Sequence, residues 1–212
     1  GPVHPFNPKP GDLKYKDQLT VDTNGDGTPD AGDGVINADD RVVVDGAYPK
    51  FYYGGSINII WKNFDVSAFF QGISGVKNYF GGMHKGWGYV PYVQGSAPTT
   101  DFVKNRWQGE GSTNKYPAMY EQSYQPVSGT HSTFWLHNAS YLRLKNLRIG
   151  YTLPSYVVQK FGLKSAQVYF SGDNLFTISD YPGADPERSS LTSSYSVYPQ
   201  LTTYAFGIKI KL

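Results

Sequence analysis

Residues 138–154, NASYLRLKNLRIGYTLP, have the alternation of a β-strand that separates two environments. One side carries Leu147, Ile149, Tyr151 and Leu153, and the other carries Arg148, Gly150 and Thr152. Because successive side chains of a strand point to opposite faces, one face is apolar and the other polar. Arg143 and Lys145 fall on the apolar side near the start. This predicts either that this end stands outside the apolar layer or that Asn146 marks a bulge.

Four other segments repeat this period of two, at residues 51–61, 64–71, 166–178 and 202–212. In the last of them, apolar side chains occupy one face and small or basic residues the other; the apolar set is Tyr204, Phe206, Ile208 and Ile210. Lys62 and Asn63 separate the first two segments, which predicts a hairpin. Residues 154–162, PSYVVQKFG, predict a short helical turn opened by Pro and closed by Gly.

The composition excludes several classes of protein. The chain has 18 Tyr, 12 Phe and 4 Trp but no Cys, which rules out a disulfide framework and a Cys-based metal site. No run approaches the roughly 20 apolar residues that a membrane helix requires. The net charge is only +2 and no basic block is present, so nucleic acid is not an expected partner. The chain begins Gly1-Pro2 without Met, and we expect a mature, cleaved or partial polypeptide.

The lengths of the connections separate two readings of these strands. In a secreted β-sandwich the apolar faces turn inward, whereas in a membrane barrel they face lipid and the polar faces line a lumen. Here short and long connections alternate, as in outer-membrane barrels with short periplasmic turns and long extracellular loops. Five strands cannot close a barrel, so the sequence predicts an all-β segment of a longer barrel whose edge partners lie elsewhere.

Several separate motifs resemble one known family. They are GDLKYKD (residues 11–17), DGVINADDR (33–41), FDVSAFFQG (64–72), the stretch 138–154, SGDNLFT (171–177), YPGADPE (181–187) and the closing strand. Together, and in this order, they resemble the C-terminal region of SusC/RagA-type TonB-dependent outer-membrane transporters. Nearly the whole chain is covered by the resemblance.

The resemblance implies an outer-membrane barrel of about 22 antiparallel strands with an N-terminal plug, located in a Gram-negative bacterium. This chain would supply the last five strands, with the long loops extracellular and the C-terminus periplasmic. The implied partners are TonB, a SusD-like surface lipoprotein, the remaining barrel and plug, and an oligosaccharide or oligopeptide substrate. No catalytic motif occurs, so we expect no enzymatic activity.

The expected segments follow from this arrangement. They are an extracellular loop with an acidic cation-binding stretch at 1–49, a hairpin of the barrel wall at 50–71, and a long extracellular loop at 72–139. Two barrel strands joined by a short periplasmic turn follow at 140–178, then an extracellular loop at 179–201 and the final barrel strand at 202–212.

The first of these loops has the spacing of a calcium-binding loop. Its candidate ligands stand at positions 1, 3, 5, 7, 9 and 12 of that pattern and are Asp22, Asn24, Asp26, Thr28, Asp30 and Asp33. Calcium takes six to eight oxygen ligands, and Gly27 occupies the position of the sharp turn. Two positions depart from the pattern, because Asp33 replaces the usual Glu and Pro29 replaces an apolar residue.

A second register of the same pattern uses residues 33–40, with Asn37, Asp39 and Asp40 as further candidates. Residues 27–33 look inserted between the two halves, so ligands from both halves are possible, with Asp39 or Asp40 in place of Asp33. The alternative is a solvated acidic loop in which Asp and Gly serve turns. Crowded carboxylates repel one another unless a cation neutralises them, which favours a structural calcium site.

The longest loop is rich in aromatic side chains, namely Trp87, Tyr89, Tyr92, Trp107, Tyr116 and Tyr120. Planar rings stack on sugars or peptide side chains and pack beneath a partner, which makes them candidates for substrate or partner contact. The alternative is that they pack against one another. A secreted calcium-binding β-sandwich for adhesion or carbohydrate binding would keep both the acidic loop and these aromatics, and is the second reading of the whole chain.

Overall fold

A computed structural model describes residues 1–5, 7–79, 100–113, 115–119, 132–183, 185–187 and 200–212. The chain divides into two compact units. One comprises Gly1–Asp45 with Phe80–Leu136, and the other comprises Gly46–Tyr79 with His137–Leu212.

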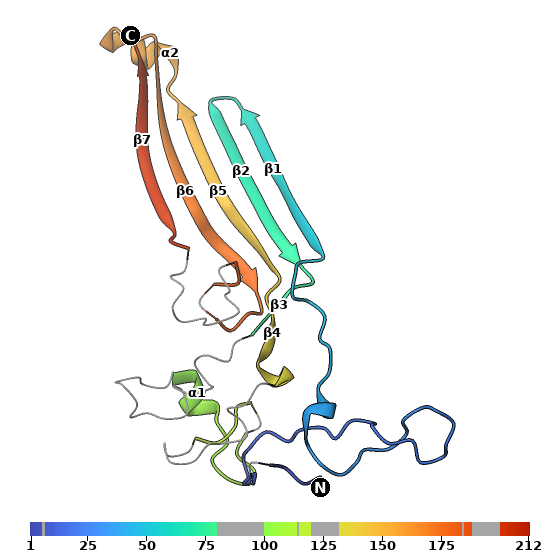
Figure 1. The fold of residues 1–212 in the computed structure, drawn as a ribbon. Coiled ribbons are helices and arrows are strands. Elements are labelled where there is room, and N and C mark those ends of the chain that lie inside the picture. Colours follow the sequence, from blue (N-terminus) through green and yellow to red (C-terminus); the bar gives the residue numbers. More distant parts are fainter. Residues whose placement is uncertain (6, 80–99, 114, 120–131, 184, 188–199) are drawn as a thin grey trace. The chain divides into compact units, whose positions relative to one another are not determined.

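The second unit is built on a five-stranded antiparallel sheet in the order β1-β2-β5-β6-β7 (Figure 1). Its strands are β1 Phe51–Trp61, β2 Phe64–Ser74, β5 Tyr141–Thr152, β6 Ser165–Ser179 and β7 Thr203–Lys211. Each strand pairs with the next of these five along the chain. In the described part of the chain β1 and β7 are the two edges of the sheet, so the sheet is open, as expected for part of a barrel.

The two short connections lie at the same end of this sheet (Figure 1). Lys62 and Asn63 join β1 to β2, and Lys62 adopts a positive φ of 52° to make this tight turn. Between β5 and β6 the chain forms α2 (Ser155–Val158) and the 3-10 turn η5 (Gln159–Phe161). Gly162 ends that turn with a φ of 71°, a left-handed conformation that Gly adopts without strain. The predicted helical turn is therefore confirmed.

The cross-strand register sorts the side chains into two faces. The outer face, as we name it, includes Ile149, which stands opposite Phe170, and Val168, which stands opposite Ile208. Side chains on this face are exposed: Phe206 is 82% exposed and Ile208 is 68% exposed. The inner face carries polar side chains, among them Asp65, Arg148 and Gln167.

A bulge explains why Arg143 interrupts the apolar alternation. Phe69 pairs with Asn146 and Phe70 with Leu144, so Lys145 is an extra residue of β5 relative to β2. The extra residue brings Arg143 onto the inner face, opposite Thr177 of β6. Of the two sequence-based explanations for Arg143, the bulge near Asn146 is confirmed.

The remaining described elements are short. A two-stranded sheet pairs β3 (Lys77–Tyr79) with β4 (Leu136–Asn138). The first unit contains the 3-10 turns η1 (Ala38–Asp40) and η4 (Thr133–Trp135) and the helix α1 (Thr100–Asn105), with Phe102 and Trp135 fully buried. Across the described residues, every helix is too short or too polar to cross a bilayer.

Candidate functional site

A polar network crosses the inner face near the end that carries the short connections. Arg148 of β5 donates hydrogen bonds to Asp65 of β2 and, at 2.7 Å, to Gln167 of β6. Gln167 in turn donates to Asp65, so the three side chains join three adjacent strands. Gly150 leaves room for this network, because a Cβ there would lie 2.4 Å from an Asp65 carboxylate oxygen.

A second charged cluster joins the inner face to the segment that follows β6. Arg143 donates to Asp185 at 2.7 Å and to Glu187 at 2.6 Å, and its Nε donates to Thr177 Oγ1 at 2.7 Å. Lys145 donates to both oxygens of Glu187 at 2.8 Å. Two cations thus face two carboxylates, and the side chains of Arg143 and Asp185 are each only 4% exposed.

Asp185 is the centre of this attachment. Its carboxylate also accepts the backbone N–H groups of Glu187 at 2.9 Å and Gln200 at 2.8 Å. Burial opposes the charged form, but the hydrogen bonds from Arg143 and from these two N–H groups outweigh it and hold the pKa of Asp185 below its ordinary value. The cluster therefore fixes both the start and the end of the connection between β6 and β7 against the strands, and we call it the loop clamp.

The acidic segment is folded into turns by its own side chains. Asp22 accepts N–H groups from Gly25 and Gly27, both at 2.7 Å, and these bonds lower the pKa of Asp22, the Gly27 bond most strongly. Asn24 accepts the N–H of Asp26, and Asp26 accepts that of Thr28. Asp30 binds the backbone and hydroxyl of Thr23, bonds that lower its pKa. The loop is thus curved with its carboxylates exposed.

The second register has a different local role. Asp33 accepts the N–H of Val35, and Asn37 accepts the N–H of Asp39 at the start of η1. Asp40 accepts the backbone N–H groups of Gln18 and Asn37, both at 2.7 Å, and these bonds lower its pKa. Asp40 therefore completes the capping box of η1.

Asp17 is an acidic neighbour that the calcium spacing did not identify. One of its oxygens accepts the Gly34 N–H at 3.0 Å, while the other is buried without a hydrogen-bond partner among the described residues. Within the described part of the chain, no three His, Asp or Glu side chains are gathered closely enough to hold a metal ion. The acidic loop is folded into turns whose carboxylates accept backbone N–H groups.

Of the six aromatic candidates, Trp107 and Tyr116 lie in the described part of the first unit, whereas Trp87, Tyr89, Tyr92 and Tyr120 lie outside the described residues. Tyr116 is only 8% exposed, contacts the Phe102 ring at 5.4 Å and donates to Asp101 at 2.7 Å. Burial and the Asp101 carboxylate raise the pKa of Tyr116. Its surroundings favour the packing alternative for this residue.

Trp107 is half-buried and lies against Gly11, where a Cβ would be 2.4 Å from the indole ring. Gly11 has a φ of 95°, and its carbonyl accepts the Ala118 N–H. Glycine is thus required at residue 11 both by its backbone conformation and by the close approach of the indole.

Sequence reasoning found Arg143 and Lys145 only as exceptions to the alternation and assigned no role to Asp185 or Glu187. The sequence did contain a signal for this cluster. Two cations at positions that the alternation assigns to the apolar face require a bulge and carboxylate partners. The motif YPGADPE supplies those partners from residues 181–187. The sequence alone did not show that these groups pair, because Arg143 and Asp185 lie 42 residues apart in the chain.

The chain is similar in sequence to known TonB-dependent receptors. The chain is 31% identical over 193 residues to TonB-dependent receptor P3 of Formosa agariphila, covering 85% of this chain. It is 29% identical to TonB-dependent receptor SusC of Bacteroides thetaiotaomicron, covering 92% of this chain. No family model matches the chain.

Solved structures of the RagAB peptide importer have a similar fold. In its closed-closed state the TM-score is 0.63 at 26% identity over 90% of this chain, and in its open-open state it is 0.61 at 26% identity over 86%. The match covers 18% of P3, 18% of SusC and 20% of the closed-closed importer chain. The chain thus spans about a fifth of the length of each of these relatives.

Proposed function

This chain is related in sequence and fold to a segment of the SusC- and RagA-type TonB-dependent receptors, and on that premise we propose that it forms the C-terminal five strands of an outer-membrane importer. The importer takes up oligosaccharides or oligopeptides together with a SusD-like surface lipoprotein. TonB energises it through parts of the protein outside this chain. The segment itself performs no covalent chemistry.

The observation that carries this proposal is the open sheet with one apolar and one polar face. Exposed apolar side chains run along the outer face of both edge strands, from Ile57 and Ile59 on β1 to Phe206 and Ile208 on β7. Soluble monomers rarely expose contiguous apolar patches of more than a few hundred Å², whereas a barrel wall presents such a band to lipid. The polar network of Asp65, Arg148 and Gln167 suits the opposite, water-filled side.

The alternative, a secreted β-sandwich, requires a second sheet to cover the apolar face. Apart from the five-stranded sheet, the described residues form only the sheet of β3 and β4, whose strands have three residues each. Two such short strands cannot cover strands of 9–15 residues. This contrast favours the barrel.

The asymmetry of the connections supports an orientation. The short connections at Lys62–Asn63 and α2 lie at the periplasmic end in this proposal, and the long connections face the cell exterior, as in other outer-membrane barrels. The loop clamp then stands at the outer end of β5. It holds the base of an extracellular loop in place, where substrate or the lipoprotein approaches.

Two substrate classes remain in the proposal. The RagAB structures are of a peptide importer, and planar aromatics such as Trp107 serve peptides and sugars alike. Extraction of the native receptor in detergent, followed by mass analysis of co-purifying proteins and ligands, tests the assignment. Recovery with a plug-containing barrel, a surface lipoprotein and bound oligomer supports it. Recovery of this chain as a detergent-free monomer contradicts it.

We also propose that the acidic segment binds a structural calcium ion. The first register is supplied by Asp22, Asn24, Asp26, Thr28, Asp30 and Asp33. The second register starts at the same Asp33 and adds Asn37, Asp39 and Asp40. The curved backbone around Gly25 and Gly27 supports this, because calcium loops use such a turn to direct alternate oxygens at one centre. Binding requires the carboxylates to exchange some backbone N–H groups for the ion.

A further inference from the structure

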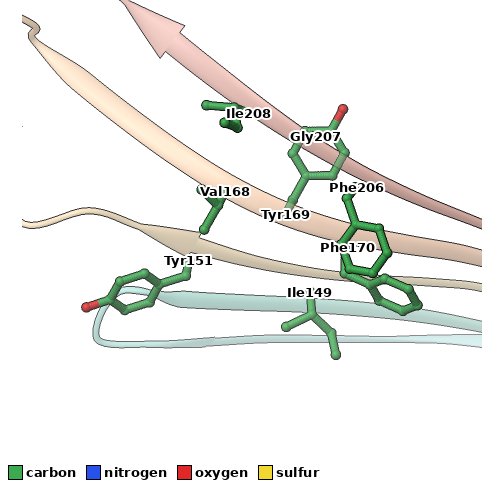
Figure 2. A pocket seen from close by; sticks show the side chains of 8 residues that line it. All are labelled: Ile149, Tyr151, Val168, Tyr169, Phe170, Phe206, Gly207 and Ile208. Carbon is green, nitrogen blue, oxygen red and sulfur yellow. The ribbon is translucent and has the colours of Figure 1, made fainter.

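The outer face is not uniformly filled where β5, β6 and β7 run side by side. A hollow of about 480 Å³ lies there, lined by the uncharged side chains Ile149, Tyr151, Val168, Phe170, Phe206 and Ile208 (Figure 2). On the opposite, inner face of the same strands the Tyr169 ring lies against Gly207, where a Cβ would be only 2.4 Å from it. The hollow is predominantly apolar and lies on the face that the proposed function turns toward lipid.

A basic connection begins two residues after Tyr151, which lines this hollow. Residues 153–164, LPSYVVQKFGLK, contain two lysines and no carboxylate. Lys160 and Lys164 are exposed, and neither forms an ion pair with a described residue. Tyr156 and Phe161 in the same connection are 69% and 76% exposed. Exposed rings beside cations are typical of the interface between hydrocarbon and headgroups.

Lys164 lies on the same side of the chain as the hollow. It shares the parity of Ala166, Val168 and Phe170, and its N–H donates to the Lys211 carbonyl at 2.9 Å, which continues the pairing of β6 with β7. Val168 is the fourth residue after Lys164, a distance of about 13 Å along a strand. For a strand tilted by roughly 45°, this is a depth of about 9 Å. A leaflet's hydrocarbon is about 15 Å thick, so the hollow lies within it when Lys164 lies at headgroup level.

We propose that this corner of the sheet is a binding site for one anionic phospholipid, with its phosphate at Lys160 and Lys164 and an acyl chain in the apolar hollow. The inference rests on the proposed barrel function, because only a membrane-embedded sheet meets such a lipid. Charge selects the ligand, because two lysines that form no ion pair with a described residue, in a connection without carboxylates, favour an anionic over a zwitterionic headgroup. The short connections place the site in the periplasmic leaflet.

The test uses the complete receptor, delipidated in detergent and titrated with phosphatidylglycerol or phosphatidylethanolamine of identical acyl chains, with binding counted by native mass spectrometry. The parent receptor retains one phosphatidylglycerol more tightly than phosphatidylethanolamine. Each lysine near a membrane surface contributes about fivefold to affinity, so Lys160→Gln with Lys164→Gln lowers phosphatidylglycerol binding by about 25-fold and removes the preference. Lys62→Gln is the matched control, because Lys62 lies in the other short turn, against Trp61, and leaves binding within about twofold.

A second variant tests binding of the acyl chain separately from binding of the charged headgroup. Val168→Phe fills part of the hollow and weakens both lipids alike, while the heat-dependent gel migration of the barrel verifies folding. Equal affinity of the parent for both lipids overturns the proposal, as does an equal loss in the Lys62→Gln control. A receptor that requires no detergent refutes the barrel assignment itself, whereas one that requires detergent but shows no headgroup preference refutes only this site.

Discussion

Replacement of Asp185 by Ala removes the centre of the loop clamp. Asp185 and Arg143 are each 4% exposed, and the carboxylate accepts bonds from Arg143, Glu187 N and Gln200 N. Removing one partner of a buried ion pair costs about 3–5 kcal/mol because the other charge stays buried. Arg143 keeps Glu187 at 2.6 Å, so we expect a value near the lower end, about 3 kcal/mol.

Hydrogen exchange on the complete receptor in detergent measures this effect locally. A cost of about 3 kcal/mol raises the population of the detached loop more than 100-fold, since each ~1.4 kcal/mol is a factor of ten. The amides of Glu187 and Gln200, which the carboxylate holds in the parent, exchange faster by that factor. Asp185→Asn keeps an acceptor oxygen of similar size and shows a smaller acceleration.

Lys115→Ala is the matched control for an ion pair of similar length. Lys115 and Asp101 are 2.9 Å apart, but their side chains are each 52% exposed, and such pairs contribute less than about 1 kcal/mol. Exchange near Lys115 therefore changes by less than about fivefold. The reasoning is refuted if Asp185→Ala leaves exchange at Glu187 and Gln200 within about threefold of the parent, or if both variants have equal effects.

Three further outcomes follow from the same contacts. Because the pKa of Asp185 is lowered below its unfolded value near 3.9, the loop clamp is fully formed above about pH 4 and is lost as the pH falls through the lowered pKa. The rate of proteolysis in the connection between β6 and β7 is therefore constant from pH 7 to 5 and rises only below pH 4. Asp22→Ala weakens calcium binding, measured by titration calorimetry, by about an order of magnitude or more, whereas the control Glu110→Gln does not. If calcium produces no binding heat with the parent protein, the calcium site is refuted. Gly207→Val forces the Tyr169 ring aside and lowers barrel stability by about 1–3 kcal/mol, measured by heat-dependent migration; unchanged migration contradicts this.

The strands were predictable because their alternation is a local property of the sequence. The register depends on that alternation, since a slip of one residue would exchange the two faces of a strand. Segments such as 202–212 therefore specify both a strand and its lipid-facing side. The open five-stranded sheet and its relation to SusC/RagA-type receptors were predicted correctly on this basis.

The loop clamp was not predictable in the same way. Arg143 could be recognised as misplaced, but the identity of its partners depends on how residues 181–187 return to the sheet. A loop of irregular φ/ψ values has no period from which that path can be calculated. For the same reason, the sequence left Tyr116 open between ligand contact and packing, and the structure packs it against Phe102 and bonds it to Asp101.

The most direct test of the membrane-wall assignment is a spin-label scan of β7 in the complete receptor, reconstituted in lipid. The absence of Cys from this chain makes single-cysteine labelling of residues 203–211 unambiguous within it. The account predicts that positions 204, 206, 208 and 210 collide preferentially with oxygen dissolved in the bilayer, and positions 203, 205, 207 and 209 with a water-soluble nickel complex. If the even positions are instead shielded from both reagents, the apolar face is packed inside a protein core and the barrel account is wrong.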